Sequence, residues 1–179
     1  MASVMILRQA READIPALQA LVEASVRELG RPFYSRQQIE QSLVHVFGVD
    51  RQLIADGTYY VVDADGEIVG CGGWSQRKTP FGGDQASDVR DATLRTPGEE
   101  PAVLRAFFVH PEWTRRGIGR WLVTACETRA RRAGFTCFEL VSTLSGRPLY
   151  AALGYREGES MAIPLAEDVV LEAVRMKKP

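Results

Sequence analysis

Three arginines surround a G-x-G pair in the segment Arg115–Arg120, which reads RRGIGR. An apolar run at residues 102–109 precedes this segment. The segment leads into residues 117–134, whose apolar positions have helical periodicity. Glycine lets the backbone approach a ligand closely. Free N–H groups at the start of a helix favour a bound phosphate, and the three arginines add charge-assisted hydrogen bonds. The segment therefore predicts a site for a diphosphate.

The glycine spacing excludes two common nucleotide-binding motifs. No G-x-x-x-x-G-K-[ST] loop is present, and the third glycine of G-x-G-x-x-G would fall at Leu122. A lone G-x-G fits a helix that merely begins with glycines in a basic loop equally well. The elements around the segment must decide between these interpretations.

Those elements follow from apolar periodicity and from turn residues. Asp14 opens one predicted helix, and the capping box of Ser35 and Gln38 opens another. The pair Asp65-Gly66 marks a hairpin. Further helices are expected at 117–134 and 147–153, and strands are expected at 4–9, 58–63, 68–74, 102–109, 137–142, 155–163 and 169–176.

The helix at 117–134 connects two of these strands, 102–109 and 137–142, as a crossover. Such a connection makes them parallel neighbours inside an otherwise antiparallel sheet. We expect an α+β fold with one mixed sheet and helices on its faces, formed by residues 1–179 as a single domain. The segment 77–101, rich in glycine, proline and acids, is predicted to be a long exposed loop with room for a short helical turn.

Four motifs in residues 104–155 carry a resemblance to a known family: Val109-His110-Pro111 at a strand end, the turn Arg116–Arg120, Ala133-Gly134-Phe135 at a helix end, and Leu149-Tyr150-x-x-x-Gly154-Tyr155. Their order and spacing closely resemble the acyl-CoA-binding half of the GNAT superfamily of N-acetyltransferases. The flanking elements fit as well, so the resemblance extends over nearly the whole chain.

The resemblance implies that the two parallel strands splay apart around acetyl-CoA, the expected co-substrate. The pantetheine arm would pair with the first of these strands, and the diphosphate would lie on the glycine turn. The residues implied in binding are Phe107, Phe108, Val109, Arg115, Arg116, Gly117, Ile118, Gly119, Arg120 and Thr143. Thr143 stands where the family often has asparagine, and Thr114 stands where it usually has glutamine or arginine.

Direct attack by a neutral amine on the thioester is the implied reaction. A backbone N–H near Val109 would stabilise the oxyanion, and Tyr150 would protonate the departing thiolate. The base stays open between Glu99, Glu100, Glu139, His110 and water. Four aromatic residues are further candidates for an acceptor pocket, although aromatic side chains in strands usually belong to the core: Phe33, Tyr34, Tyr59 and Trp74.

Composition limits the partners and the cellular location that can be expected for the protein. The net charge of -1 gives no basic field for nucleic acid, and no apolar stretch is long enough for a membrane helix. Residues 1–14 lack a signal-peptide pattern, and Cys71, Cys126 and Cys137 are widely spaced in apolar runs, so we expect buried, reduced thiols and a cytoplasmic protein. A metal site is not expected. The acceptor, a small-molecule or protein amine, stays undetermined. A homodimer is expected from the resemblance, and a non-catalytic acyl-CoA-binding module is the alternative function.

Overall fold

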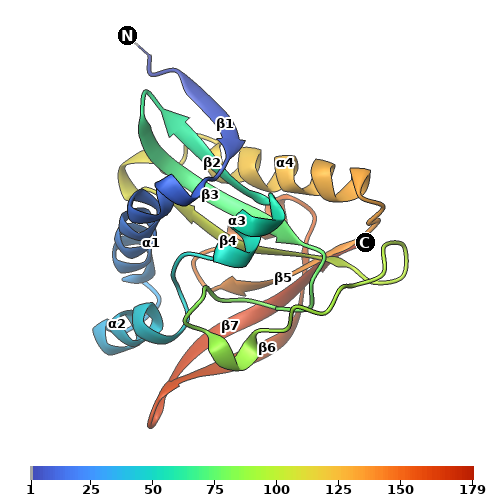
Figure 1. Cartoon of the computed structure of the whole chain (residues 1–179). Coiled ribbons are helices and arrows are strands. Elements are labelled where there is room, and N and C mark those ends of the chain that lie inside the picture. Colours follow the sequence, from blue (N-terminus) through green and yellow to red (C-terminus); the bar gives the residue numbers. More distant parts are fainter. Residues whose placement is uncertain (1) are drawn as a thin grey trace.

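The computed structural model describes residues 2–179 and arranges seven strands in one sheet, in the order β1-β2-β3-β4-β5-β7-β6 (Figure 1). The strands are β1 (Met5–Gln9), β2 (Tyr59–Ala64), β3 (Glu67–Ser75), β4 (Ala102–Val109), β5 (Phe138–Thr143), β6 (Arg156–Ala166) and β7 (Val169–Lys178). Within this sheet only β4 and β5 pair in parallel, as the crossover predicted. The α+β fold with one mixed sheet is confirmed.

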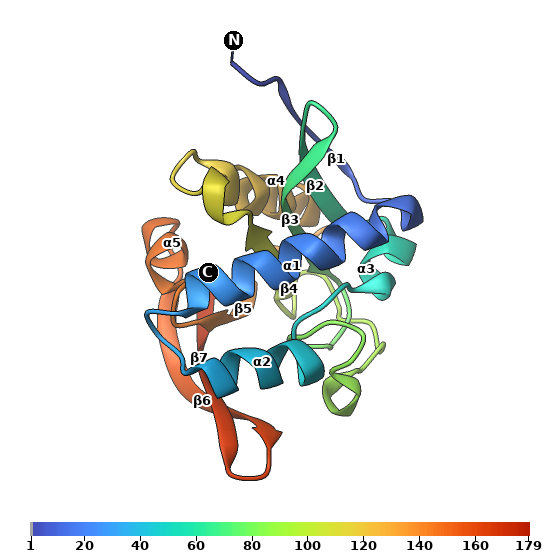
Figure 2. The same ribbon diagram turned by 90° about the vertical axis from the view of Figure 1, so that its left-hand side faces the viewer.

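Helices cover both faces of the sheet. They are α1 (Ile15–Gly30), α2 (Arg36–His45), α3 (Arg51–Asp56), α4 (Ile118–Arg132) and α5 (Arg147–Ala152). Helices α1 and α2 lie on one face and α4 lies on the other (Figure 2). Leu122 and Cys126 of α4 are fully buried against the sheet, as are Leu18 and Leu21 of α1 on the opposite face. The helical periodicity of these segments is explained by that burial.

The capping box and the hairpin that the sequence predicted are both present in the structure. Ser35 Oγ accepts the Gln38 N–H at 3.1 Å, and Gln38 Oε1 accepts the Ser35 N–H at 2.8 Å, which completes the capping box of α2. Asp65 and Gly66 both have positive φ, at 52° and 94°, and connect β2 to β3 in a tight hairpin.

Strands β4 and β5 pair only at their first residues. Ala102 faces Phe138 and Val103 faces Glu139, and no later residue of β5 pairs with β4. The opposite edge of β5 pairs with β7 along the whole strand. Directly after the paired residues, β4 has a bulge against β3 that includes Ala106, whose φ is 66°. A bulge bends its strand and disrupts the ladder. The two strands therefore diverge from the bulge onwards.

Two parts of the chain differ from the sequence-based expectation. Helix α3 was not predicted, although Asp50 caps it by accepting the Leu53 N–H at 3.1 Å and Gly57 ends it with φ of 72°. The segment 77–101 is a long loop with a short 3₁₀ turn, as expected, but it is not exposed throughout. Thr79 and Asp91 pair across it, and Thr79 and Ala86 are buried.

None of the helices in residues 2–179 combines the length and the apolar character that crossing a membrane requires. The three cysteines are free thiols, as expected, but only Cys71 and Cys126 are buried. Cys137 is half-buried and lies just before β5, which begins at Phe138 rather than at Cys137 as predicted.

Candidate active site

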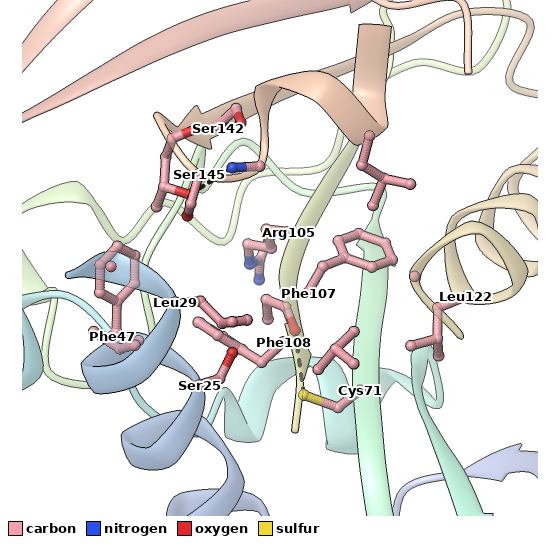
Figure 3. A pocket seen from close by; sticks show the side chains of 18 of the residues that line it. Ser25, Leu29, Phe47, Cys71, Arg105, Phe107, Phe108, Leu122, Ser142 and Ser145 are labelled. Carbon is pink, nitrogen blue, oxygen red and sulfur yellow. Dashed lines mark hydrogen bonds between the residues drawn. The ribbon is translucent and has the colours of Figure 1, made fainter. Parts of the chain in front are cut away.

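A cavity of about 610 Å³ opens where β4 and β5 diverge (Figure 3). Its walls are β4 from Leu104 to Val109, β5 from Leu140 to Thr143, the starts of α4 and α5, and side chains of α1 and α2. The volume suits a ligand of small-molecule size. The glycine turn lies at one end of this cavity, and α1 and α2 line the other.

The glycine turn presents free backbone donors to the cavity. Arg115 and Gly117 have φ of 61° and 80°, and α4 begins at Ile118 with no side-chain hydrogen bond to its first N–H groups. These donors, together with the helix dipole, favour an anion at this end. The predicted turn residues Arg115, Gly117, Ile118, Gly119 and Arg120 all line the cavity.

Arg116 is the exception within the turn. Its guanidinium lies 4.5 Å from the centre of the Trp113 ring and donates to the Glu112 carbonyl at 3.3 Å. The side chain of Arg116 therefore packs against the loop before α4 and does not line the cavity. Gly119 is needed for a different reason, since a Cβ there would lie 2.9 Å from Leu149 Cδ2 of α5.

The edge of β4 that faces β5 has unpaired backbone groups. The His110 N–H donates to the Val69 carbonyl of β3 at 2.9 Å. Backbone groups of successive residues in an antiparallel strand point to alternate sides, so those of Val109 point toward the gap. Phe107 and Phe108 also line the cavity, on opposite faces of the sheet.

Tyr150 is buried in the cavity wall, close to Phe107 and Tyr155. The ring centroids are 6.3 Å and 5.9 Å away, both in edge-on geometry. Its hydroxyl makes no hydrogen bond to any described residue, whereas that of Tyr155 reaches Glu127 at 3.4 Å. Burial, and to a smaller extent Cys126, raises the pKa of Tyr150 above its usual range, which keeps the hydroxyl protonated.

The proposed bases do not share this cavity. Glu139 is ion-paired with Arg95 at 2.7 Å, and Glu100 accepts the Thr96 N–H. His110 Nδ1 accepts the Glu112 N–H at 3.2 Å. None of these, nor Glu99, is among the lining residues, and Glu99 and Glu100 precede the paired end of β4 rather than its open end.

Thr143 lines the cavity and shares a hydrogen bond of 3.0 Å with Ser145. Cys71 also lines it, but burial raises the pKa of its thiol to about 12, so it stays protonated at neutral pH. Residues 2–179 contain no group of three or more His, Cys, Asp or Glu side chains arranged to hold a metal ion.

At the far end of the cavity, two of the four aromatic candidates are lining residues. Phe33 and Tyr34 line it, and Tyr34 donates to the Glu172 carbonyl at 2.7 Å while accepting the Leu144 N–H. Tyr59 and Trp74 are buried in the core instead.

Arg105, a lining residue that the sequence analysis overlooked, is 5% exposed. The signal for it was a charged residue in the middle of the apolar run AVLRAFFV.

The sequence of the chain matches a known protein family. A sequence model described as the acetyltransferase (GNAT) family matches residues 16–155. No curated protein sequence matches the chain significantly.

Solved structures share the fold at low sequence identity. A GCN5-related N-acetyltransferase from Rhodopseudomonas palustris matches with a TM-score of 0.72 and 20% identity, over 99% of this chain and 98% of that one. The PaiA N-acetyltransferase from Thermoplasma acidophilum, in complex with coenzyme A, matches with a TM-score of 0.66 and 15% identity over 98% of each chain. A ribosomal-protein-alanine N-acetyltransferase from Brucella melitensis gives 0.62 and 20%, over 97% and 98%.

Proposed function

Since the chain belongs to the acetyltransferase (GNAT) family, we propose that it transfers an acetyl group from acetyl-CoA to an amine in the cavity between β4 and β5. The observation that carries the proposal is the divergence of these strands, which leaves an unpaired strand edge beside an uncapped helix start. The similar structure from Thermoplasma acidophilum contains coenzyme A, which supports this choice of ligand.

The diphosphate and the pantetheine arm of acetyl-CoA each have a binding surface in this proposal. The diphosphate accepts hydrogen bonds from the N–H groups of Gly117, Ile118 and Gly119, with the Arg115 and Arg120 guanidinium groups beside them. The pantetheine arm pairs with the open edge of β4 through the backbone groups of Phe107 and the Val109 carbonyl, as an added strand would, which leaves the Val109 N–H for the thioester. Phe108 and Thr143 line its path.

In the proposed reaction the acceptor amine attacks the thioester of acetyl-CoA directly. The neutral amine adds to the thioester carbonyl carbon, and the resulting oxyanion accepts a hydrogen bond from the Val109 N–H. The carbon–sulfur bond then breaks, and the thiolate takes the proton of the Tyr150 hydroxyl. An acyl-cysteine route through Cys71 is disfavoured because its thiol stays protonated.

The ammonium form of the acceptor loses its proton before attack. No carboxylate or imidazole is among the lining residues of the described chain, and we therefore assign this proton to water. After attack the nitrogen still carries an extra proton, which passes through water to the Tyr150 phenolate, so that the amide product is neutral and the tyrosine hydroxyl is restored.

Incubation with acetyl-CoA and a panel of amines tests the proposal, with release of the CoA thiol as the readout. Release that requires both substrates, and an acetylated amine detected by mass spectrometry, are expected. A chain that binds CoA but releases no thiol with any amine would instead be the non-catalytic acyl-CoA-binding module. The panel includes small-molecule amines and peptides, since both acceptor classes are open.

A further inference from the structure

Arg105 places a buried cation in the cavity, on the strand that is assigned here to acetyl-CoA. Its side chain is 2% exposed. The Nε–H donates to Asp50 Oδ2 at 2.8 Å, and Nη1 donates to the Thr79 carbonyl at 3.2 Å. Nη2 has no hydrogen-bond partner although it is buried. A buried donor without a partner is costly, so an oxygen of a ligand would be stabilised there.

A network of ion pairs holds the Arg105 guanidinium in place. Asp50 is fully buried and also binds Arg90 at 3.1 Å, and Arg90 binds Asp84. Arg51 binds the same Asp84 at 2.8 Å. The Arg51 side chain is 65% exposed, so solvent screens its charge, and the other two arginines are matched by the two aspartates. The case for a ligand therefore rests on the unpaired Nη2 and on its place in the cavity wall.

The position of Arg105 separates it from the phosphate end of the cavity. It precedes Val109 by four residues, which is roughly 13 Å of extended strand, while Arg115 and Arg120 lie at the start of α4. In Figure 3 the Arg105 guanidinium lies near the centre of the lining side chains, with Leu29, Phe108 and Ser145 around it. These residues come from α1, β4 and the loop after β5.

The same part of the cavity is poorly suited to a polycation. The lining residues of the described chain include no aspartate, glutamate or histidine. A second ammonium group on the acceptor would therefore meet Arg105 without any carboxylate nearby. The cation also favours the neutral, nucleophilic form of a nearby amine over its ammonium form.

We infer that the acceptor carries a carboxylate, which binds the free Nη2 of Arg105 and positions the amine at the thioester. This inference rests on the proposed acetyl transfer and names the class of its acceptor: an amino acid or another amine that also bears a carboxylate. The planar guanidinium group of arginine matches the geometry of a carboxylate, whereas the ammonium group of lysine does not.

Matched acceptor pairs of increasing length test the inference, because Arg105 lies four residues before Val109 on β4: glycine with glycinamide, 4-aminobutyrate with its amide, and 6-aminohexanoate with its amide. The amide of each pair has the less basic amine, so unassisted chemistry favours the amide. We expect kcat/KM for at least one acid to exceed that of its amide by about 10- to 100-fold, the usual strength of a hydrogen bond to a charged group.

The variants Arg105→Lys and Arg105→Gln should remove this preference while KM for acetyl-CoA stays unchanged. Arg77→Lys is the matched control, because Arg77 bonds Asp56 at 2.8 Å near the same helix and does not line the cavity. Melting temperature and circular dichroism show whether each variant folds. The ratio of acid to amide rates is a readout that a general loss of stability does not move.

Three outcomes would overturn the inference: equal rates on every acid and its amide in the wild type, a preference that survives in Arg105→Lys, or a change only in KM for acetyl-CoA. The last would mean that Arg105 binds the donor. If no amine is acetylated, titration of N-acetylglycine and N-acetylglycinamide into the CoA-loaded protein still tests the subsite. Binding of the carboxylate alone, lost in Arg105→Lys, would support the subsite and contradict the transferase proposal.

Discussion

Replacing Tyr150 by phenylalanine removes one hydroxyl from the cavity wall and leaves the ring in place. The ring contacts with Phe107 and Tyr155 stay, because both are edge-on aromatic contacts that need no hydroxyl. The hydroxyl has no hydrogen-bond partner in the described chain, so its removal leaves no buried group unsatisfied. We therefore expect the free energy of unfolding to change by less than about 1 kcal/mol.

The effect on the rate follows from the chemistry of the leaving group. General acid catalysis commonly contributes about 10²–10⁴ in rate. A thiol with a pKa near 8.5 leaves tolerably well without help, so the lower end applies. We expect kcat to fall about 10²-fold in Tyr150→Phe, with CoA affinity unchanged, as for an interaction made in the transition state.

Tyr155→Phe is the matched control. Its hydroxyl donates to the buried Glu127, which also binds Lys178 at 2.8 Å, and Tyr155 is not a lining residue of the cavity. Its loss should cost about 1–3 kcal/mol of stability and leave kcat per folded molecule near that of the wild type. The two phenylalanine variants should thus show opposite patterns.

Single-turnover measurements with acetyl-CoA bound in advance separate chemistry from product release. Burial raises the pKa of Tyr150, so its ionisation should cause no fall in rate up to at least pH 10. An unchanged single-turnover rate in Tyr150→Phe would remove Tyr150 from the mechanism. A large loss of stability with a preserved rate would make it a packing residue.

Other variants test the remaining parts of the site. Gly117→Glu should abolish CoA binding in calorimetry, since it strains a position of φ 80° and places a carboxylate beside the diphosphate; unchanged affinity would mean that the phosphate site is misplaced. Gly72→Ala would push a methyl group into the Phe107 ring and should cost about 1–3 kcal/mol, measured by urea unfolding, where no loss would contradict the packing. Asp50→Asn leaves Arg105 without its buried partner and should cost about 3–5 kcal/mol; a wild-type melting curve would refute this. Burial alone would raise the pKa of Asp50, but Arg105 and Arg90 hold it below the usual value, so its contribution is present above about pH 4 and is lost as the pH falls further. The homodimer expected from the family stays a prediction, and a monomer in light scattering at high concentration would contradict it.

Much of the fold could be predicted because its signals are local. The capping box of Ser35 and the Asp65-Gly66 hairpin each depend on a few adjacent residues, and the crossover through α4 fixed the parallel pair. Helix α3 was missed because only six residues form it, and its signal lies in the cap Asp50 and the terminator Gly57 rather than in apolar periodicity.

The parts of the candidate site that have a local sequence motif, such as the glycine turn and the segment around Tyr150, could be predicted. The turn Arg115–Arg120 has a sequence signature, whereas the orientation of each arginine depends on neighbours such as Trp113, which holds Arg116 away from the cavity. Arg105 was overlooked because its role depends on Asp50, which lies 55 residues earlier in the chain. Such a contact is set by the packing of the loop before α3 against β4, and no local pattern encodes it.

A crystal structure of the chain with acetyl-CoA tests the central claim most directly. The account predicts the diphosphate on the N–H groups of residues 117–119 and the pantetheine arm along the open edge of β4. The thioester carbonyl should lie within hydrogen-bond distance of the Val109 N–H, with its sulfur beside the Tyr150 hydroxyl. A cofactor bound outside the gap between β4 and β5, or a gap that stays closed to acetyl-CoA, would contradict it.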